Sequence, residues 1–220
     1  MAEAVFTSTP ISPDGCLDKP IWRQAPAYEL NLSKDKQAEG QHLHEKAQVR
    51  FAWDSEHFYL GATLEDSDVL QEDNRDQQYH YQTGDVLELF LKPVDQTYYW
   101  ELYVTPNGLK TSLFFPGRGR LGLRSALAYQ CGLRVAARVD GQLNDWHTRD
   151  RGWSAEMALP LRDLEAQGVP LRPGVPWKVF IGRYNYSRFL PNVELSMYPA
   201  VSKTNYHLHE EWDLLHLRQA

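Results

Sequence analysis

The sequence has few of the residues that mark a disulfide scaffold, a membrane protein or a nucleic-acid-binding protein. Its 220 residues include two cysteines and three methionines, and no apolar run approaches the roughly 20 residues needed to span a bilayer. Cys16 and Cys131 lie far apart without CxxC spacing, which indicates two buried thiols rather than a metal site or a bridge. The net charge of -6 argues against nucleic acid or an anionic membrane as a partner.

The amino-terminal residues show no targeting signal. MAEAVFTSTP lacks the basic segment followed by an apolar segment that forms a signal peptide. We therefore expect the chain as it stands in the cytoplasm, or outside the cell if a leader has been removed. The length, with no internal repeat and no linker, predicts a single domain over residues 1–220.

Short alternating segments separated by turn residues run through most of the chain. The turns include Pro106-Asn107-Gly108 and Asp140-Gly141. This rhythm predicts a β-sandwich or barrel, and the lack of a βαβ pattern excludes a parallel α/β sheet. One short helix is expected over residues 161–167, ended by Gly168. The expected strands are residues 47–54, 58–65, 85–92, 98–105, 132–139, 153–159 and 177–184.

Two of these strands place an acidic residue among apolar or aromatic neighbours, on the face opposite the core. In residues 85–91 a period of two puts three leucines on one face and Glu88 on the other. In residues 99–104 it puts Glu101 beside Tyr103. Such a face suits a sugar, because C–H patches stack on rings and hydroxyls hydrogen-bond to carboxylates. The alternative is an ordinary solvated face of an antiparallel sheet.

A series of segments, which span roughly residues 10 to 217, forms an ordered set of motifs. They are DGCLDKPIW at 14–22, VRFAWD and FYL within 49–60, TGDVLELFL at 83–91, YYWELYVTPNG at 98–108, GWSAEMALP at 152–160 and EWDLL at 211–215. In this order they resemble family 9 carbohydrate-binding modules and their DOMON-like relatives, whose patterns are DG.LDE..W, v.vlWD...LYv, gDsvEiFl, yyef.vn..G, gWt.E.aIP and a final FG.L.

The resemblance implies an all-β fold: a two-sheet antiparallel β-sandwich, immunoglobulin-like or DOMON-like, with the one short helix. It also implies non-catalytic binding of a mono- or oligosaccharide, and leaves open a carbohydrate-active enzyme as a partner. Members hold a sugar ring between two aromatic side chains, and the matching positions are Tyr81 and Tyr206, where sugar-binding members have tryptophan. The motif glutamate falls on Glu88. The other ligand-binding residues implied are Glu101, Tyr103, Arg183 and Asn205.

No cofactor is required, but the resemblance points to structural calcium, which some members hold in acidic loops. Here Asp66 and Asp68 would be the ligands, in an acidic segment over residues 65–68. Carboxylate oxygens suit this ion, although the spacing matches no defined calcium loop. A merely solvated acidic loop is the alternative.

Two other functions remain open at this point. A glycoside hydrolase would need two carboxyl groups across a cleft, and Glu88 and Glu101 could face each other on neighbouring strands. A haem-binding DOMON relative would need an axial Met or His, for which Met157 and Met197 are the internal methionines.

Other short motifs have plainer interpretations. The pairs His42/His44 and His207/His209 could each begin a metal site on a strand, but surface histidines are the simpler reading. Residues 117–122 match GxGxxG, yet no strand–turn–helix context surrounds them, so we interpret them as a basic loop.

Overall fold

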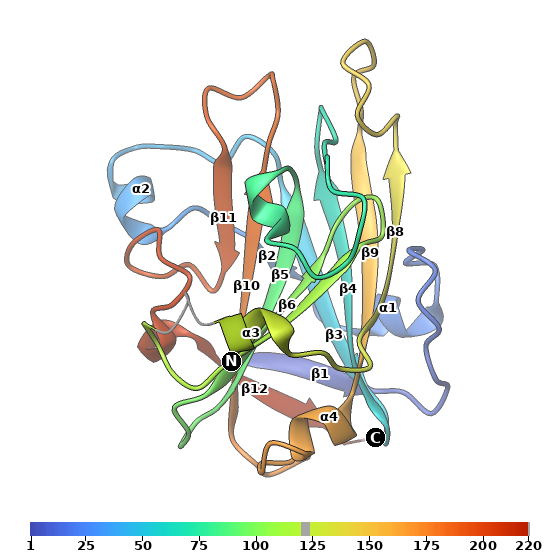
Figure 1. Cartoon of the computed structure of the whole chain (residues 1–220), viewed down its shortest axis with the longest axis vertical. Helices are drawn as coiled ribbons and strands as arrows, with labels where there is room; N and C mark the ends of the chain where they lie inside the picture. The colour runs from blue at the N-terminus through green and yellow to red at the C-terminus, as the bar shows by residue number, and fades with distance from the viewer. Residues whose placement is uncertain (120–123, 220) are drawn as a thin grey trace.

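The computed structural model describes residues 1–119 and 124–219, and most of them lie in or between β-strands (Figure 1). The twelve strands of this part are β1 (Ala2–Phe6), β2 (Tyr28–Glu29), β3 (Ala47–Trp53), β4 (His57–Glu65), β5 (Val86–Pro93), β6 (Tyr99–Val104), β7 (Lys110–Phe115), β8 (Arg134–Asp140), β9 (Gly152–Pro160), β10 (Trp177–Asn185), β11 (Glu194–Tyr198) and β12 (Asp213–Arg218). All the strands expected from the sequence are present, with ends that differ by at most two residues.

The strands form one hydrogen-bonded path rather than two separate antiparallel sheets. The order is β7-β6-β5-β10-β12-β1-β3-β4-β9-β8, with β11 paired to β10 and β2 to β3. β1 lies between β12 and β3 and is parallel to both, whereas every other strand pair is antiparallel in the described part of the chain. The expectation of two antiparallel sheets is therefore corrected to a single sheet, which the short amino-terminal strand makes continuous (Figure 1).

β1 divides this path into two halves, one from β7 to β12 and the other from β3 to β8, and the two halves share one hydrophobic core. The three leucines of β5 and the alternate residues Trp100, Leu102 and Val104 of β6 pack in the same cluster as Phe51 and Met157 of the other half. The face predicted to be core from the period of two is thus core. Burial of these aliphatic and aromatic side chains is the main force holding the halves together.

The helices are short and more numerous than the single one expected. α4 (Leu161–Glu165) confirms the expected helix, which ends two residues early in a turn. The described residues also contain α1 (Pro20–Gln24), α2 (Lys34–Ala38), α3 (Arg124–Ala128) and the 3-10 helices η1 (His80–Gln82) and η2 (His209–Glu211). Each spans only one turn or so, too little for a hydrophobic period of 3.6 to be visible in sequence. No helix in the described residues is long and apolar enough to cross a membrane.

Glu156 of β9 ties the amino-terminal segment to the sheet. Its side chain is completely buried, and Oε2 accepts hydrogen bonds from the Lys19 amine at 2.9 Å and from the backbone N–H of Asp14 and Gly15 at 2.8 and 3.2 Å. Oε1 accepts from the indole N–H of Trp22 at 2.7 Å. Four donors therefore compensate one buried carboxylate, which would otherwise be costly to bury.

We expect Glu156→Ala to lower the free energy of unfolding by about 1–3 kcal/mol, because it leaves the buried indole N–H of Trp22 and the backbone N–H of Gly15 without an acceptor. Urea denaturation followed by tryptophan fluorescence measures this. Asp140→Ala is the matched control, since it breaks an ion pair with Arg151 that lies on the surface. Its midpoint should stay close to that of the wild type. Equal effects of the two substitutions would contradict the anchoring role.

Candidate functional site

The outer face of β5 and β6 is buried, not solvated. Every residue of both strands is buried, so the side chains pointing away from the main core must be covered by other parts of the chain. A second cluster covers them, and it contains Phe90, Tyr99, Phe180, Tyr206 and Trp212 among its members. The alternative of an ordinary solvated face is therefore wrong for these strands.

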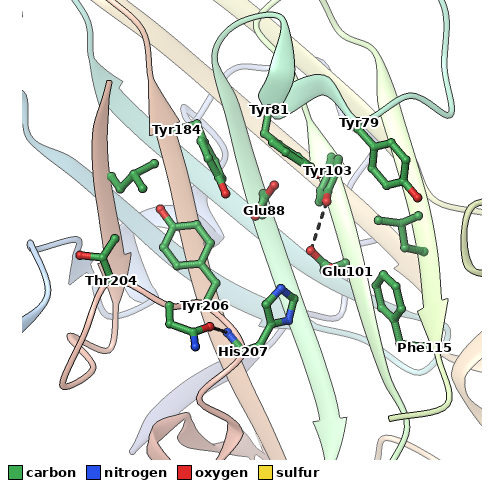
Figure 2. A pocket seen from close by; sticks show the side chains of 13 residues that line it. Tyr79, Tyr81, Glu88, Glu101, Tyr103, Phe115, Tyr184, Thr204, Tyr206 and His207 are labelled. Atoms are coloured by element: carbon green, nitrogen blue, oxygen red, sulfur yellow. Dashed lines mark hydrogen bonds between the residues drawn. The ribbon is translucent and has the colours of Figure 1, made fainter. Parts of the chain in front are cut away.

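This second cluster borders a cavity of about 650 Å³, which we call the tyrosine cavity. Figure 2 shows it with Glu88 near the centre and tyrosine rings from several elements around it. The residues lining it are Tyr79, Tyr81, Glu88, Glu101, Tyr103, Leu113, Phe115, Tyr184, Leu195, Thr204, Asn205, Tyr206 and His207. Segments far apart in the sequence thus build one site.

Most of the residues implied by the family resemblance meet here. Those that line the tyrosine cavity are Tyr81, Glu88, Glu101, Tyr103, Asn205 and Tyr206. Strand register explains part of this, because Glu88 pairs with Tyr103 and Phe90 with Glu101 across β5 and β6, which puts both glutamates on one face. Their convergence is a finding, and their roles toward a ligand stay predictions.

Arg183 does not line the cavity, and its assignment is corrected. Its side chain is fully buried on the other face of β10, where a guanidinium N–H donates to the carbonyl of Glu65 at 2.6 Å and lies 3.3 Å from the Asp66 carboxylate. Since successive strand residues point to opposite faces, its neighbour Tyr184 lines the cavity instead.

Tyr81 is positioned by contacts of the preceding residue, His80, and of its own backbone carbonyl. It lies in η1, where the side chain of His80 is fully buried and its Nδ1 lies 2.7 Å from the Asp73 carboxylate. The Tyr186 hydroxyl donates to the Tyr81 carbonyl at 2.6 Å. The Tyr81 ring stacks on Tyr184 with centroids 5.2 Å apart and planes 29° apart, so these two rings form one continuous aromatic wall (Figure 2).

Tyr206 is held more tightly than Tyr81. It is 6% exposed, and its hydroxyl lies 2.7 Å from the carbonyl oxygen of Arg183 and 3.1 Å from that of Ser196. Its ring lies directly over Gly182 of β10, where an added Cβ would come within 2.4 Å of a ring carbon. Glycine at this position therefore makes room for the tyrosine.

Glu88 and Glu101 form a buried acidic pair beside Tyr103. The Tyr103 hydroxyl donates to Glu101 Oε1 at 3.1 Å, whereas Glu88 Oε1 has no hydrogen-bond partner among the described residues. Burial raises the pKa of Glu101 to about 8, and burial together with the Glu101 charge raises the pKa of Glu88 well above its usual value. A protonated carboxyl group can both donate and accept a hydrogen bond.

Comparison with known proteins gives matches at the level of structure alone. No family model matches the chain, and no curated protein matches it by sequence. A proposed carbohydrate-binding protein from Bacteroides uniformis is similar over 98% of each chain, with TM-score 0.72 and 12% identity. A family 9 carbohydrate-binding module from Caldicellulosiruptor kristjanssonii in complex with cellotriose is similar over 100% of this chain and 94% of that one, with TM-score 0.65 and 14% identity.

The same kind of module from C. kristjanssonii in complex with glucose matches with TM-score 0.64 and 13% identity, over 99% of this chain and 96% of the other. The chain has a CBM9-like fold. The family resemblance read from the sequence motifs is thereby confirmed for the fold. The CBM9-like fold is nearly coextensive with this chain, because both chains are covered almost completely in each match.

In this CBM9-like fold the two residues proposed to bind calcium have arginine partners. Asp66 is fully buried beside Arg183, and burial raises its pKa to about 6 although the guanidinium opposes this shift. Asp68 is paired with Arg188. Within the described part of the chain, no three His, Cys, Asp or Glu side chains gather as a metal site. The arrangement lends no support to calcium at Asp66 and Asp68, which stays a prediction.

The remaining motifs have varied outcomes. Met157 lies in the main core and Met197 in the second cluster, and neither lines the tyrosine cavity. His207 does line it, and burial lowers the pKa of this imidazole to about 4. The GxGxxG match falls partly outside the described residues. Cys16 and Cys131 are half-buried free thiols.

Sequence reasoning missed several lining residues. Tyr184 could have been found from the period of two along β10, which sets it opposite the core. The others that were missed are Tyr79, Leu113, Phe115, Leu195, Thr204 and His207. Most of these lie in strands or loops that the sequence pattern did not place beside β5, so only their tertiary contacts bring them to the site.

We expect Gly182→Ala to lower the free energy of unfolding by about 1–3 kcal/mol, because the new methyl group collides with the Tyr206 ring. Chemical denaturation of the single and double variants tests this. In a Tyr206→Ala background, where the ring is absent, Gly182→Ala should be neutral or slightly stabilising. An equal penalty in both backgrounds would show that the ring does not set the requirement for glycine.

The raised pKa of Glu101 predicts a specific dependence of stability on pH. Glu101 binds a proton more tightly in the folded protein than in the unfolded protein. Its contribution to the free energy of unfolding is therefore complete below the unfolded-state pKa near 4.5, and it is lost as the pH rises toward about 8. Glu101→Gln keeps the shape and an acceptor for Tyr103 but cannot ionise. Its stability relative to the wild type should therefore increase from pH 5 to 8. Denaturant midpoints that shift in parallel across this range would contradict the assignment.

Proposed function

We propose that the chain binds a carbohydrate non-covalently in the tyrosine cavity. The observation that carries this is the coincidence, in one cavity, of exposed aromatic surface with a carboxyl pair that still has hydrogen-bonding capacity. Aromatic faces stack on the C–H patches of a sugar, while the carboxyl groups recognise hydroxyls. The CBM9-like fold supports the proposal, since two of its structural neighbours are modules in complex with cellotriose and glucose.

In this proposal the sugar ring lies against Tyr81 and Tyr206, and Glu88 binds its hydroxyls. Tyr81 is the partly exposed ring and Tyr206 the buried one, so the first offers a face from the rim and the second from the floor. Glu88 lines the cavity and its carboxyl group has hydrogen-bonding capacity that no described residue fills, so a ligand hydroxyl bound to this group would use part of that capacity. Glu101, Tyr103 and Asn205 supply further polar groups in the same cavity.

The carboxyl pair also bears on glycoside hydrolysis, the second function considered. Hydrolysis needs one carboxylic acid and one ionised carboxylate at the same pH. Here the pKa of both groups is raised, so neither Glu88 nor Glu101 is set to stay ionised at neutral pH. We therefore propose that the chain binds the sugar without catalysing a reaction, and that a carbohydrate-active enzyme is its partner. Turnover of aryl glycosides that is lost in Glu88→Gln would contradict this.

We expect Tyr81→Ala to weaken sugar binding by about 1–3 kcal/mol, as for an aromatic residue that anchors a ligand. A glycan array identifies the sugar, and titration calorimetry then measures the affinity. Tyr206→Ala should weaken binding similarly but also destabilise the fold, because that ring is buried.

The matched control is Trp146→Ala. Trp146 is 71% exposed and does not line the tyrosine cavity, so its removal should leave the affinity unchanged. Unaltered binding in Tyr81→Ala, or the same loss in both variants, would place the sugar somewhere other than this cavity.

A further inference from the structure

A second hollow of about 610 Å³ adjoins the tyrosine cavity, and the two share Leu195 and Thr204 as lining residues. We call it the β11 hollow. It lies where the loop between β10 and β11 faces α2 and residues 41–44. Figure 1 shows β11 between α2 and β10, and Figure 2 shows Thr204 at the β11 side of the tyrosine cavity. The boundary between the two spaces is therefore a pair of side chains and not a layer of the fold.

This boundary is fixed in place. The Thr204 hydroxyl lies 2.7 Å from that of Ser33, and the backbone N–H of Lys34 donates to the carbonyl of Val201 at 2.8 Å. Leu195 is held in the β10–β11 ladder opposite Tyr184. Thr204 is itself exposed, so the boundary between the two spaces is open to solvent on the Thr204 side. A ligand that extends from the tyrosine cavity would therefore meet only these two side chains, among the described residues, at the boundary.

The β11 hollow has a preformed wall. Glu194 is 8% exposed, and its Oε2 accepts a hydrogen bond from the backbone N–H of His44 and lies 2.8 Å from Nδ1 of the same residue. Its other oxygen accepts from the backbone N–H of Glu45 at 3.2 Å. These bonds tie residues 44 and 45 to β11, and this preorganisation lowers the entropy lost when a ligand binds.

The lining combines apolar surface with exposed polar groups. Val193 is 40% exposed, and Pro191 and Leu195 extend the apolar patch. Exposed side chains with donors and acceptors surround it, including His42 and Asn192. An apolar patch with hydrogen-bonding groups at its edge is the composition that a sugar ring matches, because a sugar has C–H faces and hydroxyl edges.

Charges around both spaces favour an uncharged ligand. In the β11 hollow the Lys36 amine lies 3.0 Å from the Glu39 carboxylate and the His44 ring lies 2.8 Å from the Glu194 carboxylate, so neither side chain is free to pair with an anion. The described residues that line the tyrosine cavity include no lysine or arginine, so the carboxylate of an acidic sugar would lose water there without gaining a partner of opposite charge.

We propose that the ligand is a neutral oligosaccharide, with one end in the tyrosine cavity and the following residues crossing Leu195 and Thr204 into the β11 hollow. This inference rests on the proposed function, since it assumes that a sugar occupies the tyrosine cavity. It adds that affinity depends on chain length and that residues of the α2 side contribute to it.

The first test is titration calorimetry with glucose, cellobiose and cellotriose, together with matched series of mono- to trisaccharides built from xylose, mannose and galactose. In the series that binds, we expect the trisaccharide to bind at least about tenfold more tightly than the monosaccharide, which is the effect of one or two additional hydrogen bonds. Equal affinities would overturn the inference and leave the proposed function intact. Failure of every series to bind would instead overturn the proposed function, and this inference with it.

The second test separates the two spaces with the variant His42→Ala/Asn192→Ala. Both residues are exposed, so the fold should persist, and unchanged thermal unfolding checks this. The variant should bind the trisaccharide about as weakly as the monosaccharide while its monosaccharide affinity stays that of the wild type. His216→Ala, an exposed histidine of β12 outside both hollows, is the control. Trisaccharide affinity that survives the double substitution would overturn the inference.

Discussion

Burial of the central strands on both faces is the constraint from which the site follows. β5 and β6 place aliphatic and tryptophan side chains on the face that meets the other half of the sheet, and this face belongs to the main core. Their opposite face would be solvated in a simple sandwich, but here a second aromatic cluster covers it. Polar side chains on that face are consequently held away from bulk water. Everything distinctive about the tyrosine cavity depends on this second burial.

The consequence is visible in the acidic pair. Glu88 and Glu101 would be unremarkable on a solvated strand, yet in this position their pKa is raised because burial disfavours the charged form. The protein gives Glu101 a partner in Tyr103 but leaves Glu88 Oε1 without one in the described residues. An incompletely satisfied polar group costs stability, and such costs concentrate at functional sites. The same strands that stabilise the fold thus carry a buried carboxyl oxygen that has no hydrogen-bond partner among the described residues.

The contrast with Arg183 shows how local the distinction is. One residue along β10, the side chain turns from the cavity face to the opposite face, where the guanidinium contacts Glu65 and Asp66. Both sides of the strand are buried, so burial alone could not have shown which residue lines the site. The strand period could, and it selects Tyr184. The periodicity locates the lining residue here because alternation along a regular strand fixes which face each side chain occupies.

Several elements were invisible in the sequence for physical reasons. β1 is five residues long and pairs with strands that are distant in the chain, so its parallel position between β12 and β3 leaves no local signal. β11 is equally short, and its neighbours include the loop that carries Thr204. Short segments of this kind are stabilised by the contacts they find on folding rather than by their own propensity.

The amino-acid sequence by itself determined the alternation of each long strand. It therefore determined which residues of β5 and β6 belong to the core and which face away from it, since side-chain direction follows from the backbone period. The family motifs determined the fold, as the structural similarity confirms. Only the tertiary structure decided that the second face is covered, that Gly182 makes room for Tyr206, and that the β11 hollow adjoins the tyrosine cavity. These features depend on contacts between segments far apart in the chain, and no local pattern encodes such distances.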